Sequence, residues 1–136
     1  MNPAPFTITV HAKERVLEVR YPERPTMAFY EQYELEVRAA ILRLAAEGPW
    51  DCIVDQSALR ALAPDFPPRI AVLNAWAREH GMHRTARLVS DSAVGELQTV
   101  RILRESGVLH IGAVFHDRAA AWAFVTGAAG SGHAGQ

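Results

Sequence analysis

Several residues of this sequence could take part in catalysis, but they do not form a catalytic pattern. Ser57 has no histidine at the spacing of a hydrolase motif, and there is no Gly-x-Ser-x-Gly turn. Residues 128–132 are rich in glycine, yet they lack the lysine of a phosphate-binding loop and the spacing of a dinucleotide-binding loop. We therefore expect a non-catalytic domain that uses no cofactor.

Two histidines, His80 and His83, lie close enough in sequence to share a metal ion. A zinc site needs about three or four ligands. The other histidines show no ligand spacing: His11, His110, His116 and His133. At the end of a helix, His80 has a simpler role beside the free carbonyl groups. We expect no metal site.

Ser57 is the sharpest candidate for a binding or regulatory site because of the elements expected around it. Residues 50–55 contain a short apolar run that predicts a central strand covered on both faces. Residues 58–62 predict a helical turn. A serine between a strand and a helix is exposed, and the helix N-terminus stabilises an added phosphate. The alternative is that Ser57 only caps the turn and that Asp55 hydrogen-bonds its own backbone.

The other elements follow from apolar periodicity. Residues 6–10 and 16–19 alternate as strands and predict an antiparallel hairpin, and residues 85–90 and 108–115 predict two later strands. Four helices are expected between or after the strands, with caps at Thr26, Asp65, Asp91 or Ser92, and Asp117. The third helix is expected to bury one apolar face, composed of Val94, Leu97, Val100, Ile102 and Leu103.

The order β-β-α-β-α-β-α-β-α predicts an α/β fold, with a mixed, mostly parallel sheet and helices packed on it. We expect one domain over residues 1–126 and a flexible tail over residues 127–136, which are rich in glycine and alanine. Four arginines on two expected elements fit either a basic patch or a solvated face: Arg84, Arg87, Arg101 and Arg104.

The composition is that of an ordinary globular domain. The chain has 136 residues and a formal net charge of −1, which gives no long-range attraction to nucleic acid or anionic membranes. Cys52 is the single cysteine and is expected to be buried and inert. The first residues lack the features of a signal peptide, and no apolar run approaches the roughly 18 residues of a membrane span. We expect a soluble, cytoplasmic protein.

Three segments resemble the bacterial STAS-like family, which is related to anti-sigma-factor antagonists. Residues 54–59 read Val-Asp-Gln-Ser-Ala-Leu and are similar to the family signature Asp-x-Ser-Gly-Leu, with Ala58 in place of the glycine. Residues 86–90, followed by a helix that ends at Gly107, resemble the family's fourth strand and third helix. Residues 114–122 are similar to its closing strand and alanine-containing helix.

The resemblance implies a STAS-like fold and a regulatory or protein-interaction role. In the family the aligned serine is phosphorylated by a partner kinase, and the phosphate ends partner binding. It therefore implies a site at Ser57, with Asp55, Gln56, Ala58 and Leu59 around it. The implied partner is a protein such as a kinase-like anti-sigma factor, and a second copy of the chain is a further candidate.

Aromatic and methionine side chains suggest an alternative function. Core packing is the ordinary use of Phe29, Tyr33 and Trp122. An opening lined by aromatic and methionine residues would instead bind a small apolar ligand or lipid. The residues that we assign to such a site are Met27, Tyr30, Trp76 and Met82. STAS domains resemble the lipid-binding half of CRAL-TRIO proteins, which gives this alternative a basis in analogy.

Overall fold

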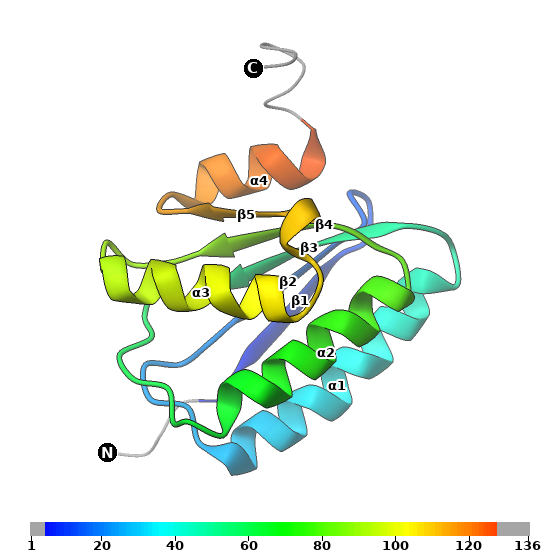
Figure 1. Cartoon of the computed structure of the whole chain (residues 1–136). Helices are drawn as coiled ribbons and strands as arrows, with labels where there is room; N and C mark the ends of the chain where they lie inside the picture. Colours follow the sequence, from blue (N-terminus) through cyan, green and yellow to red (C-terminus); the bar gives the residue numbers. More distant parts are fainter. Residues whose placement is uncertain (1–4, 128–136) are drawn as a thin grey trace.

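A five-stranded sheet, in the spatial order β1-β2-β3-β4-β5, organises the chain (Figure 1). The computed structural model describes residues 5–127. The strands are β1 (Thr7–His11), β2 (Val16–Arg20), β3 (Trp50–Asp55), β4 (Met82–Leu88) and β5 (Gly112–Phe115). The helices are α1 (Met27–Ala45), α2 (Phe66–Glu79), α3 (Ala93–Glu105), the short 3-10 helix η1 (Leu109–Ile111) and α4 (Arg118–Thr126).

The α/β fold and the predicted order of elements are confirmed. β1 and β2 form the expected antiparallel hairpin, and β2, β3, β4 and β5 run parallel to one another. The tail predicted over residues 127–136 lies, apart from Gly127, outside the described residues. Because β2 to β5 share one direction, the loops that follow them emerge at the same end of the sheet.

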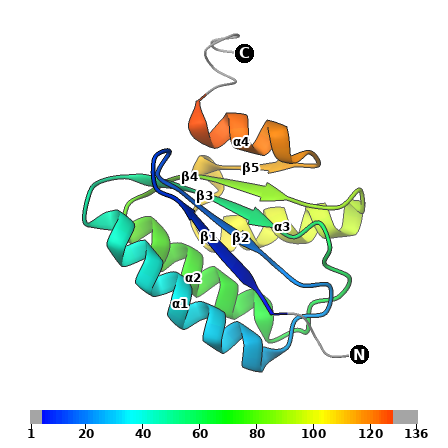
Figure 2. The same ribbon diagram turned by 180° about the vertical axis from the view of Figure 1, so that it is seen from behind.

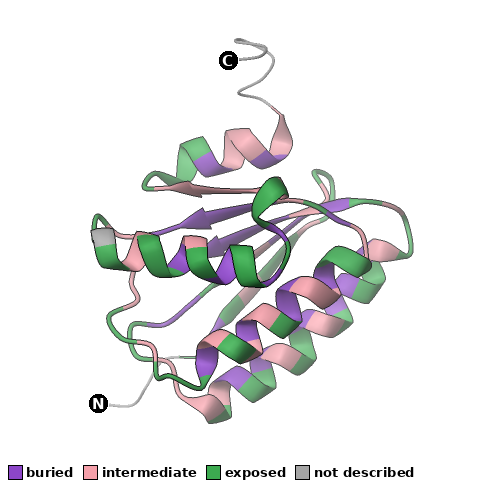
Figure 3. Ribbon diagram, viewed as in Figure 1, coloured by how far each residue is buried: buried purple, intermediate pink, exposed green. Residues whose placement is uncertain are grey.

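Helices cover the two faces of the sheet unequally (Figures 1 and 2). α1, α2 and α3 share one hydrophobic core with residues such as Cys52 and Val54, while α4 packs on the opposite face against Ile53. This alternation along β3 is the expected pattern of a central strand covered on both faces. Figure 3 shows buried residues along the sheet and along the helix sides that face it.

Short polar residues begin the helices, as the sequence predicts. The Thr26 hydroxyl accepts from the N–H of Phe29 at 3.3 Å, and the carboxylate of Asp117 accepts from the N–H of Ala120 at 3.1 Å. Of the two residues proposed to cap α3, Ser92 is the cap. Asp65 occupies the N-cap position of α2, but its side chain makes no capping hydrogen bond.

Arg15, in the hairpin turn, ties the sheet to the end of α1. Its φ angle of 59° lies in the left-handed region, which non-glycine residues adopt rarely. The guanidinium donates to the carbonyl oxygens of Leu44 at 2.6 Å, Gly48 at 2.8 Å and Pro49 at 2.9 Å. These bonds satisfy carbonyl groups that a helix C-terminus leaves without partners, and they fix the entry into β3.

Two strand boundaries differ from the prediction. β4 begins at Met82 rather than at residue 85, because Met82 pairs with Trp50 of β3. The last strand begins at Gly112 rather than at residue 108. Val108 is fully buried and its N–H donates to the carbonyl of Leu103 at 3.0 Å, so the chain stays bound to the end of α3 before the sheet resumes.

Candidate functional site

The candidate residues around Ser57 lie where the parallel strands end. We call this region the carboxyl end, and it consists of residues 56–60, 89–92 and 116, which follow β3, β4 and β5. The ends of parallel strands are where α/β folds most often place their binding residues. Ser57, Ala58, Leu59 and Ser90 line a shallow hollow here, together with Glu23 and Arg60, and its volume is about 450 Å³.

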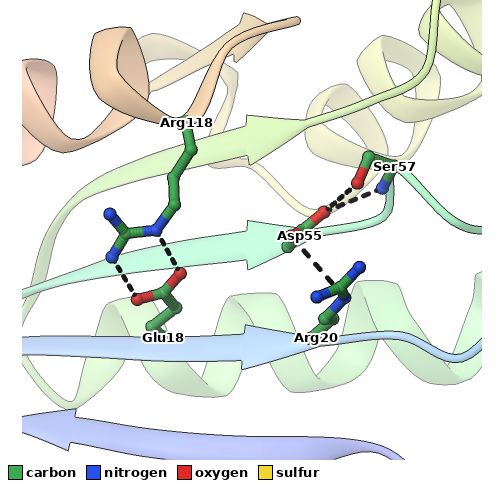
Figure 4. Close-up of polar contacts among 5 residues, drawn as sticks. All are labelled: Glu18, Arg20, Asp55, Ser57 and Arg118. Carbon is green, nitrogen blue, oxygen red and sulfur yellow. Dashed lines mark hydrogen bonds and ion pairs between the residues drawn. The ribbon is translucent and has the colours of Figure 1, made fainter.

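A turn closed by Asp55 sets the conformation of this loop (Figure 4). Asp55 is buried at the end of β3, and its Oδ1 accepts from the backbone N–H of Ser57 at 2.9 Å and from the Ser57 hydroxyl at 2.6 Å. The Nε of Arg20, on the neighbouring strand, lies 3.9 Å from the other carboxylate oxygen. The backbone hydrogen bond that the sequence offers as the alternative role of Asp55 is therefore formed.

The prediction of a helical turn over residues 58–62 is wrong. After the turn at residues 57–58 the chain runs irregularly, and α2 begins only at Phe66. The N–H of Leu59 donates to Gln56 at 3.0 Å, and the N–H of Arg60 donates to Glu23, in the loop after β2, at 2.9 Å. A carbonyl three residues back and a carbonyl of a distant loop thus replace the i−4 carbonyls of a helix.

This correction changes the electrostatics that were expected for Ser57. No helix begins directly after the serine, so the helix dipole expected from residues 58–62 is not there to stabilise a phosphate. The hydroxyl is instead a donor to a carboxylate at 2.6 Å. A phosphate at this oxygen would remove that donor and would place two like charges in contact.

The other predicted members of the site are half-buried in or beside the loop. The N–H of Gln56 donates to the carbonyl of Leu88 at 2.7 Å, and its side-chain amide lies 3.5 Å from the hydroxyl of Thr99 on α3. Leu59 is half-buried against the main core, and Ala58 is half-buried in the turn. Gln56 therefore connects the end of β3 with both β4 and α3.

Two exposed apolar residues lie in the first turns of α3, directly after this region in the chain, and sequence reasoning misplaced them. Val94 is 76% exposed and Leu97 is 70% exposed, although both were expected in the core. The buried face consists of Thr99, Ile102, Leu103 and Ser106. Figure 1 shows the first turns of α3 extending past the tip of β4.

The spacing of the apolar residues on α3 could have revealed this. At about 3.6 residues per turn, Val94 and Leu103 fall on opposite sides of a helix. The true inward face has the spacing of an ordinary buried stripe, but two of its members, Thr99 and Ser106, are polar.

A second polar cluster lies on the face of the sheet that carries α4 (Figure 4). Arg118, in the first turn of α4, donates two hydrogen bonds to the carboxylate of Glu18 on β2. The Nε donates at 2.8 Å and the terminal Nη2 donates at 2.7 Å. His11 lies 2.9 Å from the same carboxylate. The hydrogen bonds from Arg118 lower the pKa of Glu18, and those from His11 add to this effect, while partial burial opposes it. The cluster fixes α4 on the hairpin.

The four residues assigned to an apolar ligand do not meet in one opening. Tyr30 is fully buried among aromatic rings that include Phe6 and Phe66, and its hydroxyl has no hydrogen-bond partner among the described residues. Met82 is also buried and lines an internal cavity of about 20 Å³, which has space for roughly one water. Met27 contacts Arg69, whereas Trp76 stacks on His80.

The two histidines considered as metal ligands have separate partners. A ring nitrogen of His80 lies 2.8 Å from the carbonyl of Trp76, and His83 lies 3.3 Å from Asp51. Within residues 5–127, no three histidine, cysteine, aspartate or glutamate side chains are grouped to hold a metal ion. Cys52 is buried as predicted, and burial raises its pKa to about 11, so the thiol stays protonated at neutral pH.

No protein-family model, curated protein or solved structure matches this chain. The resemblance to STAS-like domains therefore rests on the three sequence segments named above. In the described part of the chain, no helix combines the length and the apolar character that are needed to cross a membrane.

The ion pair between Glu18 and Arg118 makes stability depend on pH. Because the pKa of Glu18 is lower in the folded state, its contribution is present above the unfolded-chain pKa and is lost as the pH falls through the folded value. We expect Glu18→Gln to be less stable than wild type at about pH 7 and the difference to shrink towards about pH 3. Urea unfolding across this range measures it.

Glu14→Gln is the matched control, because Glu14 is an exposed residue of the same hairpin. It should follow the wild-type curve at every pH. A difference between Glu18→Gln and wild type that stays constant with pH would contradict the assigned role of the ion pair.

Proposed function

We propose that this chain is a non-catalytic, STAS-like protein-interaction domain that contacts a protein partner at its carboxyl end. The observation that carries the proposal is the exposure of Val94 and Leu97 on the first turns of α3, close to the Ser57 loop. The two residues are three positions apart, so their side chains lie on the same side of the helix. A contiguous exposed apolar patch with a polar rim is typical of a protein-interaction surface.

The surroundings of the two apolar residues supply such a rim. Gln56 links the Ser57 loop to α3 through Thr99, and Ser90 lines the hollow beside Ser57. Glu96, between Val94 and Leu97 in sequence, is half exposed and lies 3.0 Å from His116. Apolar, hydrogen-bonding and charged groups therefore occur together, which fits a protein partner better than a nucleic acid or a small apolar ligand.

We further propose that phosphorylation of Ser57 by a kinase-like partner switches this contact off. The physical basis is the turn in which the Ser57 hydroxyl donates to Asp55. A phosphoserine cannot donate in this way, and its charge repels the Asp55 carboxylate. The turn would open, and residues 56–60 would lose the conformation that a partner contacts.

The first test compares two exposed apolar pairs on different helices. A pull-down from a lysate of the source organism with Val94→Asp/Leu97→Asp should lose a specific partner that wild type retains. If these residues are central, the dissociation constant rises about tenfold or more. Titration calorimetry with the purified partner measures this change.

Leu35→Asp/Leu42→Asp on α1 is the matched control, since these side chains are 74% and 51% exposed. It should bind the partner as wild type does, and circular dichroism should show both variants folded. Loss of binding in the control alone, or equal binding by all three proteins, would overturn the assignment of the surface.

The second test separates the charge at Ser57 from the loss of its hydroxyl. Ser57→Ala keeps the backbone bond to Asp55 and loses one side-chain hydrogen bond, about 1 kcal/mol, so partner binding should persist. Ser57→Asp should weaken binding, because it places a second carboxylate beside Asp55. Adding Asp55→Asn to Ser57→Asp removes the repulsion and should restore part of the binding.

Binding and thermal unfolding of the four proteins are measured together. If Ser57→Asp binds as tightly as wild type, Ser57 is not a switch. If Asp55→Asn does not relieve the effect of Ser57→Asp, the repulsion between the two side chains is not its cause.

A further inference from the structure

Arg87 is a buried cation whose position in the core has no role in the proposed contact surface. It lies on β4 beneath α2 and is 2% exposed, although the sequence suggested a basic patch or a solvated face. Its guanidinium donates to the hydroxyl of Thr85 at 3.0 Å and to the side-chain oxygen of Asn74 at 2.9 Å. Both acceptors are neutral, so these bonds orient the cation without compensating its charge.

Three ionisable side chains that interact with Arg87 carry no negative charge at neutral pH. Burial raises the pKa of Cys52 to about 11, and it raises the pKa values of Tyr21 and Tyr33 well above the ordinary tyrosine value. The charge of Arg87 lowers the pKa of each of these groups, but burial outweighs it.

A small cavity with a buried lining adjoins this cation. Its volume is about 20 Å³, and Arg87 is its single charged lining residue among those described. Every residue that lines it is buried, and most are aliphatic or aromatic side chains from α1, α2 and the sheet. The space exceeds the roughly 10–15 Å³ that one water needs, so it admits one particle of about that size.

We propose that this cavity is a binding site for one small monovalent anion of the halide class, with chloride as the natural occupant, held by Arg87 and Asn74. A buried charge without a counter-charge is strongly destabilising. A single water would supply a dipole, whereas a halide supplies the full opposite charge in a space that excludes larger anions. The ion neutralises the charge of Arg87 in the core. The folded chain binds the ion, whereas the unfolded chain does not.

The proposal predicts that chloride stabilises the protein by mass action. At constant ionic strength, replacing sodium gluconate with sodium chloride should raise the midpoint of thermal unfolding by several degrees in a saturable way. Gluconate is too large for the cavity and serves as the reference anion. In crystals grown with sodium bromide, an anomalous peak should lie in the cavity within hydrogen-bond distance of the Arg87 guanidinium.

Asn74→Asp is the sharpest variant, because it places a carboxylate where Asn74 already accepts from Arg87. The Ser106 hydroxyl, now 3.2 Å from the Asn74 amide nitrogen, donates to the carbonyl of Ile102 and would have to leave it to donate to the new oxygen. The protein then carries its own counter-charge, so this variant should be as stable in gluconate as in chloride. Arg87→Met should also lose the chloride dependence, while Arg104→Met, which removes an exposed arginine of α3, should retain it.

Three results would overturn the proposal. Wild-type unfolding midpoints that are equal in chloride and gluconate would show that no halide binds. A chloride dependence that persists in Asn74→Asp would place the ion elsewhere. A cavity without an anomalous bromide peak would mean that water or nothing fills it. If Arg87→Met does not fold, Asn74→Asp still tests whether the ion binds beside Arg87.

Discussion

The shared direction of β2, β3, β4 and β5 is the constraint on which the rest of the structure depends. It brings residues 56–60, 89–92 and 116 to one end of the sheet. Parallel pairing of β2 with β3 also sets Arg20 opposite Asp55. The right-handed crossovers that such a sheet requires then place α2 and α3 on one face. The proposed contact surface follows from this arrangement, although residues 56–60, 89–98 and 116 are far apart in sequence.

Much of the fold could be predicted from the sequence, because its signals are local. The hairpin, the caps at Thr26 and Asp117 and the position of β3 follow from alternation and from short polar residues. The boundaries that were wrong depend on hydrogen bonds that lie outside the apolar pattern. The N–H of Arg60 donates to the distant loop after β2, and the N–H of Val108 donates to Leu103 in the last turn of α3. Apolar periodicity within a segment indicates neither contact.

In the candidate site, too, the features with local sequence signals could be predicted and the others could not. The adjacency of Asp55 and Ser57 is visible in the sequence, but the helical turn expected to follow is replaced by an irregular segment in which the N–H of Arg60 donates to the distant Glu23. Apolar residues on α3 were misplaced because Thr99 and Ser106 occupy inward positions. Arg87 was misplaced for a related reason: its charge suggests solvent, while its alternation within β4 directs it into the core beside Asn74. Buried polar residues whose hydrogen-bond partners lie far along the chain cannot be placed from the sequence pattern alone.

The central claim is that the carboxyl end, with the first turns of α3, is the contact surface of this domain. Hydrogen–deuterium exchange of the chain alone and in complex with its captured partner tests this most directly. The account predicts slower exchange in the complex at residues 56–60 and 93–98, with no change along the outer side of α1. Protection along α1 without protection at the carboxyl end would contradict it.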